Sequence, residues 1–263
     1  MTATVTSDIR DAVAWITIQR PSAGNALRGA DVQALSAAVR QALADTGVRV
    51  LVISGEGDKF FCTGGDLSEL AHGLADIGLH IRKWHDLVDM VEAAEKPVIA
   101  ALNGHAVGGG LELALACHQR IASARSRLGV PELNAGLFPS AGGVRRLTRL
   151  LGASTALELT LSTELWTAQT ALARGLVNRV CEPGEVLAQA GEMASRLAAF
   201  EPNSLRAVLV CARTAAFNVD TVELEISLLR ECYQTEANRV RLREFQQQLG
   251  RPAPSSINKE STQ

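Results

Sequence analysis

The chain has 263 residues, of which 47% are hydrophobic and 21% are charged, and its formal net charge is −2. This length allows one large core, or a core with a small appendage. No block of acidic or basic residues stands out and no apolar run is longer than a strand, so the composition predicts no nucleic-acid partner, no membrane-surface partner and no bilayer-spanning segment.

The five cysteines lie at positions 62, 117, 181, 211 and 232 and include no C-x-x-C pair. An odd number with this spacing predicts neither a disulfide framework nor a zinc ribbon. The first residues also lack the cationic segment and apolar run of a secretory signal. A cytoplasmic location is therefore expected.

Strands and helices alternate through most of the chain. The signals are β-branched alternation or short buried runs for strands, and apolar residues at helical spacing for helices, with Asp31 as the expected N-cap of the first helix. In chain order they predict strand 13–18, helix 31–43, strand 49–54, helix 66–71, helix 80–94, strand 98–102, helix 110–117, strand 120–123, a helix from residue 145 and strand 177–180. This alternation predicts a layered α/β domain.

The last part of the chain is almost wholly helical in its pattern. Its apolar spacing predicts three helices at residues 188–199, 204–216 and 222–249. We therefore divide the chain into a core domain, residues 1–195, and a helical module, residues 196–263. Such a module needs a surface to pack against, either its own core or that of a neighbouring subunit.

A first glycine-rich segment, residues 60–66 (FFCTGGD), follows a predicted strand and precedes a predicted helix. The paired glycines Gly64 and Gly65 allow backbone N–H groups to face a ligand without obstruction by a Cβ atom. The alternative is a tight connection that needs a positive φ angle. This segment alone does not decide between the two.

A second glycine-rich segment, residues 103–112 (NGHAVGGGLE), also joins a predicted strand to a predicted helix. A helix that begins near Gly109 directs its free N–H groups into the turn and favours negative charge there. The turn is not a dinucleotide-binding fingerprint, because the position three beyond Gly110 is Leu113. No Gly-Lys-Ser/Thr of a P-loop follows any glycine run, and Ser140 does not sit in a G-x-S-x-G elbow.

Two glutamates accompany these turns. Glu112 could simply complement the helix dipole, but its neighbours are apolar all round, so it is expected to be buried, which is costly for a carboxylate without a partner or a role. Glu132 lies in a loop among apolar neighbours, and a surface position is the alternative there. Together, the two glutamates and two glycine turns predict acid–base chemistry next to an oxyanion.

Five segments resemble, in order and spacing, the enoyl-CoA hydratase/isomerase (crotonase) superfamily. They are residues 20–27, 61–66, 96–114, 131–132 with 136–143, and 171–178, within a resemblance from about residue 10 to about residue 253. Each motif is weak alone, but five in register identify the chain as a member. The resemblance implies a crotonase-type ββα spiral core with a C-terminal helical trimerisation module, as a homotrimer or a dimer of trimers.

The resemblance also implies the chemistry. Gly65 and Gly109 match the positions whose N–H groups form an oxyanion hole for a thioester carbonyl, while Glu112 and Glu132 match the carboxylates that hold a water molecule and exchange protons with it and with the substrate α-carbon. Isomerases of the family usually keep only the second carboxylate. The implied activity is therefore that of an enoyl-CoA hydratase, which adds water reversibly and syn to a 2-enoyl-CoA.

Coenzyme A, as part of the acyl-CoA substrate, is the implied ligand, and no separate cofactor or metal is expected, since the histidines lack metal-ligand spacing. The matching coenzyme A-binding positions are Ser22, Ala23, Gly24, Thr63, Gly65, Asp66, Leu67, Ser68 and Gly109, with Phe245 where a tail aromatic meets a neighbour's ligand. Ser22 replaces a basic residue that often meets a coenzyme A phosphate, which leaves Arg28 as a substitute.

Two alternatives remain. The same site supports other enolate reactions on an acyl-CoA, such as isomerisation, decarboxylation or retro-aldol cleavage, and the fold also allows a non-catalytic acyl-CoA-binding subunit. The acyl group cannot be read from the sequence, although residues 71–78 are expected to border its pocket. Arg145, Arg146 and Arg149 form a cationic helix face that salt bridges explain better than RNA binding, given the negative net charge.

Overall fold

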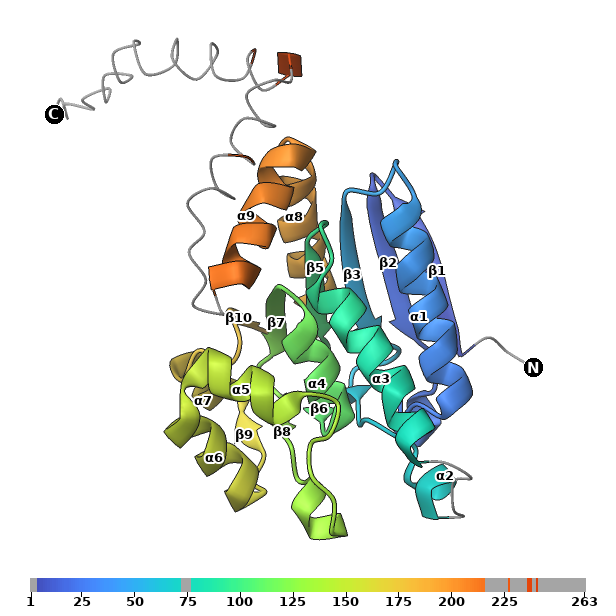
Figure 1. Cartoon of the computed structure of the whole chain (residues 1–263), viewed down its shortest axis with the longest axis vertical. Coiled ribbons are helices and arrows are strands. Elements are labelled where there is room, and N and C mark those ends of the chain that lie inside the picture. Colours follow the sequence, from blue (N-terminus) through green and yellow to red (C-terminus); the bar gives the residue numbers. More distant parts are fainter. Residues whose placement is uncertain (1–3, 72–76, 216–226, 228–235, 238–239, 241–263) are drawn as a thin grey trace, which may run out of the picture.

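The computed structural model describes residues 4–71, 77–215, 227, 236–237 and 240. Two β-sheets form its framework (Figure 1). The larger sheet has the strand order β1 (Val5–Arg10), β2 (Val13–Ile18), β3 (Val50–Gly55), β5 (Val98–Leu102), β7 (Gln119–Ser123) and β10 (Arg179–Cys181). Its strands are parallel except for the antiparallel pair β1 and β2.

The smaller sheet has the order β4 (Phe60–Cys62), β6 (His105–Val107), β8 (Arg127–Gly129) and β9 (Trp166–Thr167). Its first three strands are parallel, and β8 pairs antiparallel with β9. None of these strands exceeds three residues, so side-chain alternation could not reveal them in the sequence. In particular, β6 occupies part of what the sequence predicted to be a glycine turn.

From β3 to β8, consecutive strands alternate between the two sheets, and helices follow each pair. Strands β3 and β4 lead to α2 (Leu67–Ala71) and α3 (Ile77–Glu92); β5 and β6 lead to α4 (Gly109–Ala116); β7 and β8 lead to η2 (Glu132–Ala135), α5 (Gly143–Leu151) and α6 (Ala153–Ser162). The other helices are η1 (Pro21–Ala23), α1 (Gly29–Ala44), α7 (Ala168–Ala173), α8 (Val186–Ala198) and α9 (Pro202–Ala215). This strand–strand–helix repeat confirms the predicted ββα spiral.

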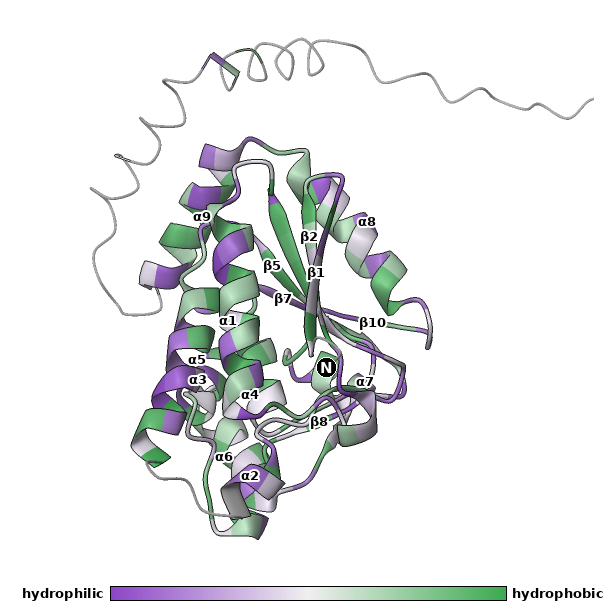
Figure 2. Cartoon of the chain, turned by 90° about the vertical axis from the view of Figure 1, so that its right-hand side faces the viewer, coloured by the Kyte–Doolittle hydropathy of each residue, from purple (hydrophilic) through white to green (hydrophobic). Residues whose placement is uncertain are grey.

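The larger sheet is covered on both faces, which explains the continuous apolar run of β3. Side chains of successive residues point to opposite faces of a strand. Leu51 and Ile53 pack in the core cluster with α1, α3 and α4, whereas Val50 and Val52 pack against Val186 and its neighbours on α8. Figure 2 shows α8 on one side of the sheet and α1 on the other.

The start of α1 differs from the prediction. The N-cap is Arg28, and Asp31 lies three residues farther on, where its carboxylate accepts a hydrogen bond from the Arg28 backbone N–H at 2.9 Å. The prediction of Asp31 as N-cap is therefore wrong. The apolar periodicity starts only at Val32, which placed the expected start too late, while Asp31 satisfies the cap from within the first turn.

The first of the C-terminal helices, α8, packs against the core domain. Helix α8 covers one face of the larger sheet, and residue 195 lies within it. Helix α9 is held by Arg206, which donates to Glu95 at 2.8 Å, and by Arg213, which donates to the Ala93 carbonyl at 2.8 Å. The predicted helix 222–249 lies outside the described residues, so the division at residue 195 and the trimerisation role stay predictions. Within the described ranges, no helix is long and apolar enough to cross a bilayer.

Candidate active site

A cavity of about 500 Å³ lies between α3, α4 and η2 and brings together the main predicted site residues. Thr63, Gly65, Leu67, Gly109, Glu112 and Glu132 all line it. These residues come from two glycine turns and two other segments, which meet because β4 and β6 are parallel neighbours whose ends open at the same edge of the smaller sheet. The arrangement places both carboxylates and both turns around one space.

The two glycine turns approach more closely than side chains would allow. Gly64 has a φ angle of 91° and Gly108 one of 56°, both in the region that favours glycine. A Cβ atom on Gly64 would lie 2.7 Å from the backbone nitrogen of Gly109. Glycine is thus required here for the close approach itself.

Two backbone N–H groups face this cavity without a partner. Helix α4 begins at Gly109, and the first N–H groups of a helix have no acceptor inside it. In the part of the chain that the structure describes, neither the Gly65 nor the Gly109 N–H donates a hydrogen bond. Because the positive end of the α4 dipole also points here, the position favours an oxygen that carries negative charge.

Glu112 projects from the first turn of α4, whose following residues are all buried. Its side chain is buried as predicted, with 3% of the residue exposed, and its Oε1 accepts a hydrogen bond of 2.7 Å from the backbone N–H of Gly143. Burial, followed by the charge of Glu132, raises the pKa of Glu112 to about 7. A group with such a pKa can accept or donate a proton near neutral pH.

Glu132 is held differently. It begins the 3-10 helix η2, and burial also raises its pKa. Its Oε2 is buried and has no hydrogen-bond partner among the residues described. A buried carboxylate oxygen without a partner costs free energy, so it is expected where a ligand supplies the partner.

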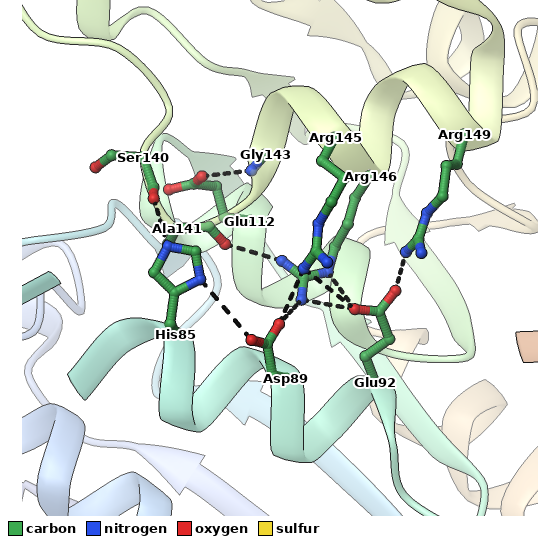
Figure 3. Close-up of polar contacts among 10 residues, drawn as sticks. All are labelled: His85, Asp89, Glu92, Glu112, Ser140, Ala141, Gly143, Arg145, Arg146 and Arg149. Carbon is green, nitrogen blue, oxygen red and sulfur yellow. Dashed lines mark hydrogen bonds and ion pairs between the residues drawn. The ribbon is translucent and has the colours of Figure 1, made fainter. Parts of the chain in front are cut away.

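A polar cluster behind Glu112 connects α3 with α5 (Figure 3). It contains the salt bridges that the sequence predicted for the three arginines: Arg145 pairs with Asp89, Arg146 pairs with Asp89 and Glu92, and Arg149 pairs with Glu92. The sequence did not predict that Arg146 is buried: it is 2% exposed and donates to the Ala141 carbonyl at 2.8 Å. Its place with Gly143 and Leu147 on one helix stripe was the available signal.

Two of the predicted coenzyme A-binding residues line a second hollow of about 450 Å³. Ser22 and Ala23 of η1 line it together with Arg20. Gly24 follows with a φ angle of 66°, and a Cβ atom there would lie 3.1 Å from the Thr63 side chain. Thr63 itself lines the cavity described above.

Asp66 and Ser68 lie beside the cavity, on either side of Leu67. The Asp66 carboxylate accepts hydrogen bonds from the Ser68 hydroxyl at 2.6 Å and from Arg20 at 3.0 Å, and these contacts lower its pKa. Arg28, the suggested phosphate ligand, is paired with Asp31 at 2.8 Å. Phe245 lies outside the described residues.

The sequence predicted only part of the wall that α3 and the loop before α5 contribute. The residues of this wall that it did not predict are His80, Ile81, Trp84, Leu137, Phe138, Ser140 and Ala141. Ile77 and Gly78 belong to the segment expected to border the acyl pocket, while residues 72–76 lie outside the described residues. The amphipathic pattern of α3 indicated which face is buried but not that part of this face lines a cavity.

Comparisons with known proteins agree with this arrangement. The family model described as enoyl-CoA hydratase/isomerase matches residues 8–249. The chain is 36% identical over 230 residues to a short-chain-enoyl-CoA hydratase of Clostridium acetobutylicum, covering 85% of this chain and 87% of that one. It is 38% identical to the 2,3-dehydroadipyl-CoA hydratase of Escherichia coli, and the match covers 83% of this chain and 84% of that one. The crystal structure of an enoyl-CoA hydratase from Bacillus anthracis superposes with a TM-score of 0.85 at 31% identity. The superposition covers 93% of this chain and 96% of that one.

Proposed function

The chain belongs to the enoyl-CoA hydratase/isomerase family, and from this premise we propose that it is an enoyl-CoA hydratase that adds water reversibly to the double bond of a 2-enoyl-CoA thioester. One observation carries the proposal. The cavity is lined by two carboxylates with raised pKa values, Glu112 and Glu132, and by two glycines whose backbone N–H groups have no partner among the described residues. Hydration needs both parts, since one proton leaves water while another reaches carbon, and negative charge develops on oxygen in between.

In the proposed mechanism, the thioester carbonyl oxygen accepts hydrogen bonds from the Gly65 and Gly109 N–H groups. Water attacks the β-carbon and gives a proton to an ionised carboxylate, while the double-bond electrons move onto the carbonyl oxygen as an enolate. The two N–H groups bind this enolate more strongly than the neutral carbonyl, which lowers the barrier. The other carboxyl group, in its protonated form, then delivers a proton to the α-carbon.

Glu112 and Glu132 are suited to this exchange because both carboxyl groups hold a proton more readily than an exposed glutamate does. Burial raises both pKa values, and the charge of Glu132 further raises that of Glu112. One carboxylate and one carboxylic acid can therefore coexist in the cavity. Addition from one side of the substrate follows if both groups act on the same face, which gives syn stereochemistry.

Coenzyme A is proposed to lie along η1 and the start of α2. Ser22, Ala23, Gly24 and Thr63 would contact the adenine, and Asp66, Leu67 and Ser68 would continue that wall. The exposed side chain of Leu67, 66% exposed, at the mouth of the cavity supports this path. The acyl group stays open, because the relatives named above act on acyl chains of different chemistry.

The direct test is a screen of purified protein against 2-enoyl-CoA thioesters of varied chain length, with products identified by mass. We expect a gain of one water without added metal or nucleotide. Loss of activity on chelation that a divalent metal restores would contradict the proposed mechanism. Hydration that survives Glu112→Gln, together with double-bond isomerisation that depends on Glu132 alone, would instead support an isomerase. Tight binding of acyl-CoA without any turnover would support a non-catalytic subunit.

We also propose that the helical module, residues 196–263, mediates assembly into a trimer, with trimers able to pair, and that Phe245 approaches a neighbour's ligand. Light scattering at micromolar concentration should give a trimeric or hexameric mass; a monomeric mass would contradict the assembly. The cysteine pattern supports a reducing, cytoplasmic location for this enzyme.

A further inference from the structure

We infer that Arg146 is a positioning residue for Glu112: from behind the cavity, it fixes the short turn at residues 141–143 so that the Gly143 N–H is directed at the Glu112 carboxylate. The kinetic part of this inference rests on the proposed hydratase function. Arg146 does not line the cavity. It would act on the reaction only through Glu112.

The turn joins the two hydrogen bonds on which the inference depends. At one end, the Ala141 carbonyl accepts a 2.8 Å hydrogen bond from Nη1 of Arg146. At the other end, the Gly143 N–H donates to Oε1 of Glu112 at 2.7 Å. Only Gly142 separates them, with a φ angle of 86°. Fixing the Ala141 carbonyl therefore restricts the orientation of the Gly143 N–H.

The turn needs such an anchor because its own chain is permissive. Gly142 and Gly143 follow each other, and glycine adopts many more backbone conformations than other residues. A side chain cannot replace the anchor, because a Cβ atom on Gly143 would lie 2.7 Å from Oε1 of Glu112. The close approach of Gly143 to Glu112 thus requires glycine, and the backbone conformation of this glycine turn has to be restrained by contacts from outside it.

Arg146 is itself held firmly by α3. Its guanidinium donates to Asp89 at 2.6 Å and to Glu92 at 2.7 Å, which neutralise a side chain that is only 2% exposed (Figure 3). His85, one helical turn before Asp89, meets the Ser140 carbonyl at 2.9 Å. Helix α3 therefore contacts the Ser140 carbonyl directly through His85, and holds in place the Arg146 side chain of α5 that binds the Ala141 carbonyl. The planar guanidinium can contact two carboxylates and a carbonyl at once, which a lysine ammonium cannot do with the same geometry.

Arg146 also acts on Glu112 by its charge. The charged or titratable groups around Glu112 are Glu132 from η2 and Arg146 from α5, while His80 of α3 lines the same cavity. Behind Arg146 stand His85, Asp89 and Glu92 of α3 and its neighbour Arg145. The positive charge of Arg146 lowers the pKa of Glu112, against the upward effects of burial and of Glu132. Its removal should move that pKa above about 7.

The kinetic test compares Arg146→Gln with Arg149→Gln. Arg149 lies on the same helix and pairs with the same Glu92, but it has no part in the turn, so it is the matched control. Arg146→Gln should lower kcat by about 10- to 100-fold with KM changed less than threefold, because a small misplacement of a catalytic group has this cost. In the plot of kcat against pH, the inflection that reports the ionisation of Glu112 should move to higher pH. Arg149→Gln should change neither quantity.

Two further variants separate positioning from general loss of structure. Arg146→Lys keeps the positive charge but not the planar set of N–H donors. The pH at which Glu112 ionises should therefore stay the same while kcat falls. In a Glu112→Gln background, Arg146→Gln should reduce the residual rate less than twofold, because the two changes then act through the same group. If Arg146→Gln does not fold, Arg146→Lys decides the matter: an unchanged kcat in this variant would overturn the inference. Full additivity of the two losses, or equal effects of Arg146→Gln and Arg149→Gln, would overturn the inference.

A readout independent of turnover separates this inference from the proposed function. Infrared difference spectra across a pH titration should show the Glu112 carboxyl band, identified by its loss in Glu112→Gln, titrating at higher pH in Arg146→Gln. An unchanged titration would overturn the charge part of the inference even in an active hydratase. A shifted titration in a protein that hydrates no enoyl-CoA would support the positioning role while the hydratase proposal fails.

Discussion

The two walls of the catalytic cavity are built in opposite ways. On one side, Glu112 sits on a buried helix and its carboxylate accepts a backbone N–H. The turn that carries this donor is tied to Arg146 of α5, which in turn is paired with Asp89 of α3. On the other side, Glu132 sits on a 3-10 helix of four residues, and its Oε2 has no partner in the described part of the chain. One carboxylate is satisfied by the protein and the other is not.

This difference indicates how one cavity can use two glutamates. A carboxylate held by a fixed donor keeps a constant position and a pKa set by its surroundings. A carboxylate with an unsatisfied oxygen keeps a strong acceptor available for a substrate or a water molecule. We therefore expect the Glu112 side to provide geometry and the Glu132 side to provide the more accessible proton acceptor.

The largest expected effect is the loss of either proton carrier. Glu132→Gln and Glu112→Gln keep the side-chain size but abolish proton transfer, so each should lower kcat by roughly 10²–10⁴ while thioester binding is retained. Steady-state kinetics and calorimetric titration of a product analogue provide the measurements. Glu158→Gln, on an exposed residue paired with Arg174, is the control and should have normal kinetics. A hundredfold loss of kcat in only one of the two variants would contradict the proposal that both glutamates transfer protons.

The next effect concerns a backbone donor between the two walls. Gly109→Pro would remove the N–H at the first position of α4, where proline is compatible with a helix, and should lower kcat by about 10²–10³. Gly109→Ala keeps the donor and should be less impaired, although its methyl would meet the Trp84 ring at 3.2 Å. Circular dichroism must first establish folding of both variants. A folded proline variant with normal turnover would show that Gly109 serves only the turn.

A smaller effect is expected on stability, with a sign fixed by the raised pKa of Glu112. Its ordinary value is 4.5 and its folded value about 7, so the folded protein binds a proton that the unfolded chain releases between these values. The free energy of unfolding should therefore fall as pH rises through this window. Glu112→Gln lacks this penalty and should be more stable than the wild type by up to about 3 kcal/mol at pH 8, with little difference near pH 4.5. Urea unfolding at both pH values measures this, and a variant less stable at pH 8 would contradict it.

The smallest effect is expected outside the two walls. Ser68→Ala removes the hydroxyl that donates to Asp66, which should loosen the proposed coenzyme A-binding wall and raise KM by roughly three- to tenfold. The value of kcat should stay within twofold, because no proton carrier is touched. A change in kcat with KM unaffected would place this segment in the chemistry instead of in ligand binding.

The sequence by itself determined the pieces of the site. The glycine pairs follow strands and precede helices because such connections need free backbone dihedrals, and this is a local property. The burial of Glu112 followed from its apolar neighbours along one short helix, and the structure confirms it. Strand and helix alternation likewise predicted the layered α/β core, since it depends on the spacing of apolar residues within single elements.

Only the tertiary structure decided how these pieces meet. The donor to Glu112 lies 31 residues farther along the chain, and the acidic partner of Arg146 lies 57 residues away, so no local pattern links them. The N-cap of α1, the short strands of the smaller sheet and the α3 wall were likewise settled by contacts between distant segments. The physical reason is the cost of burying charge. An arginine or a glutamate is buried only where several elements together supply its partners, and packing, not proximity in the sequence, decides which residues these partners are.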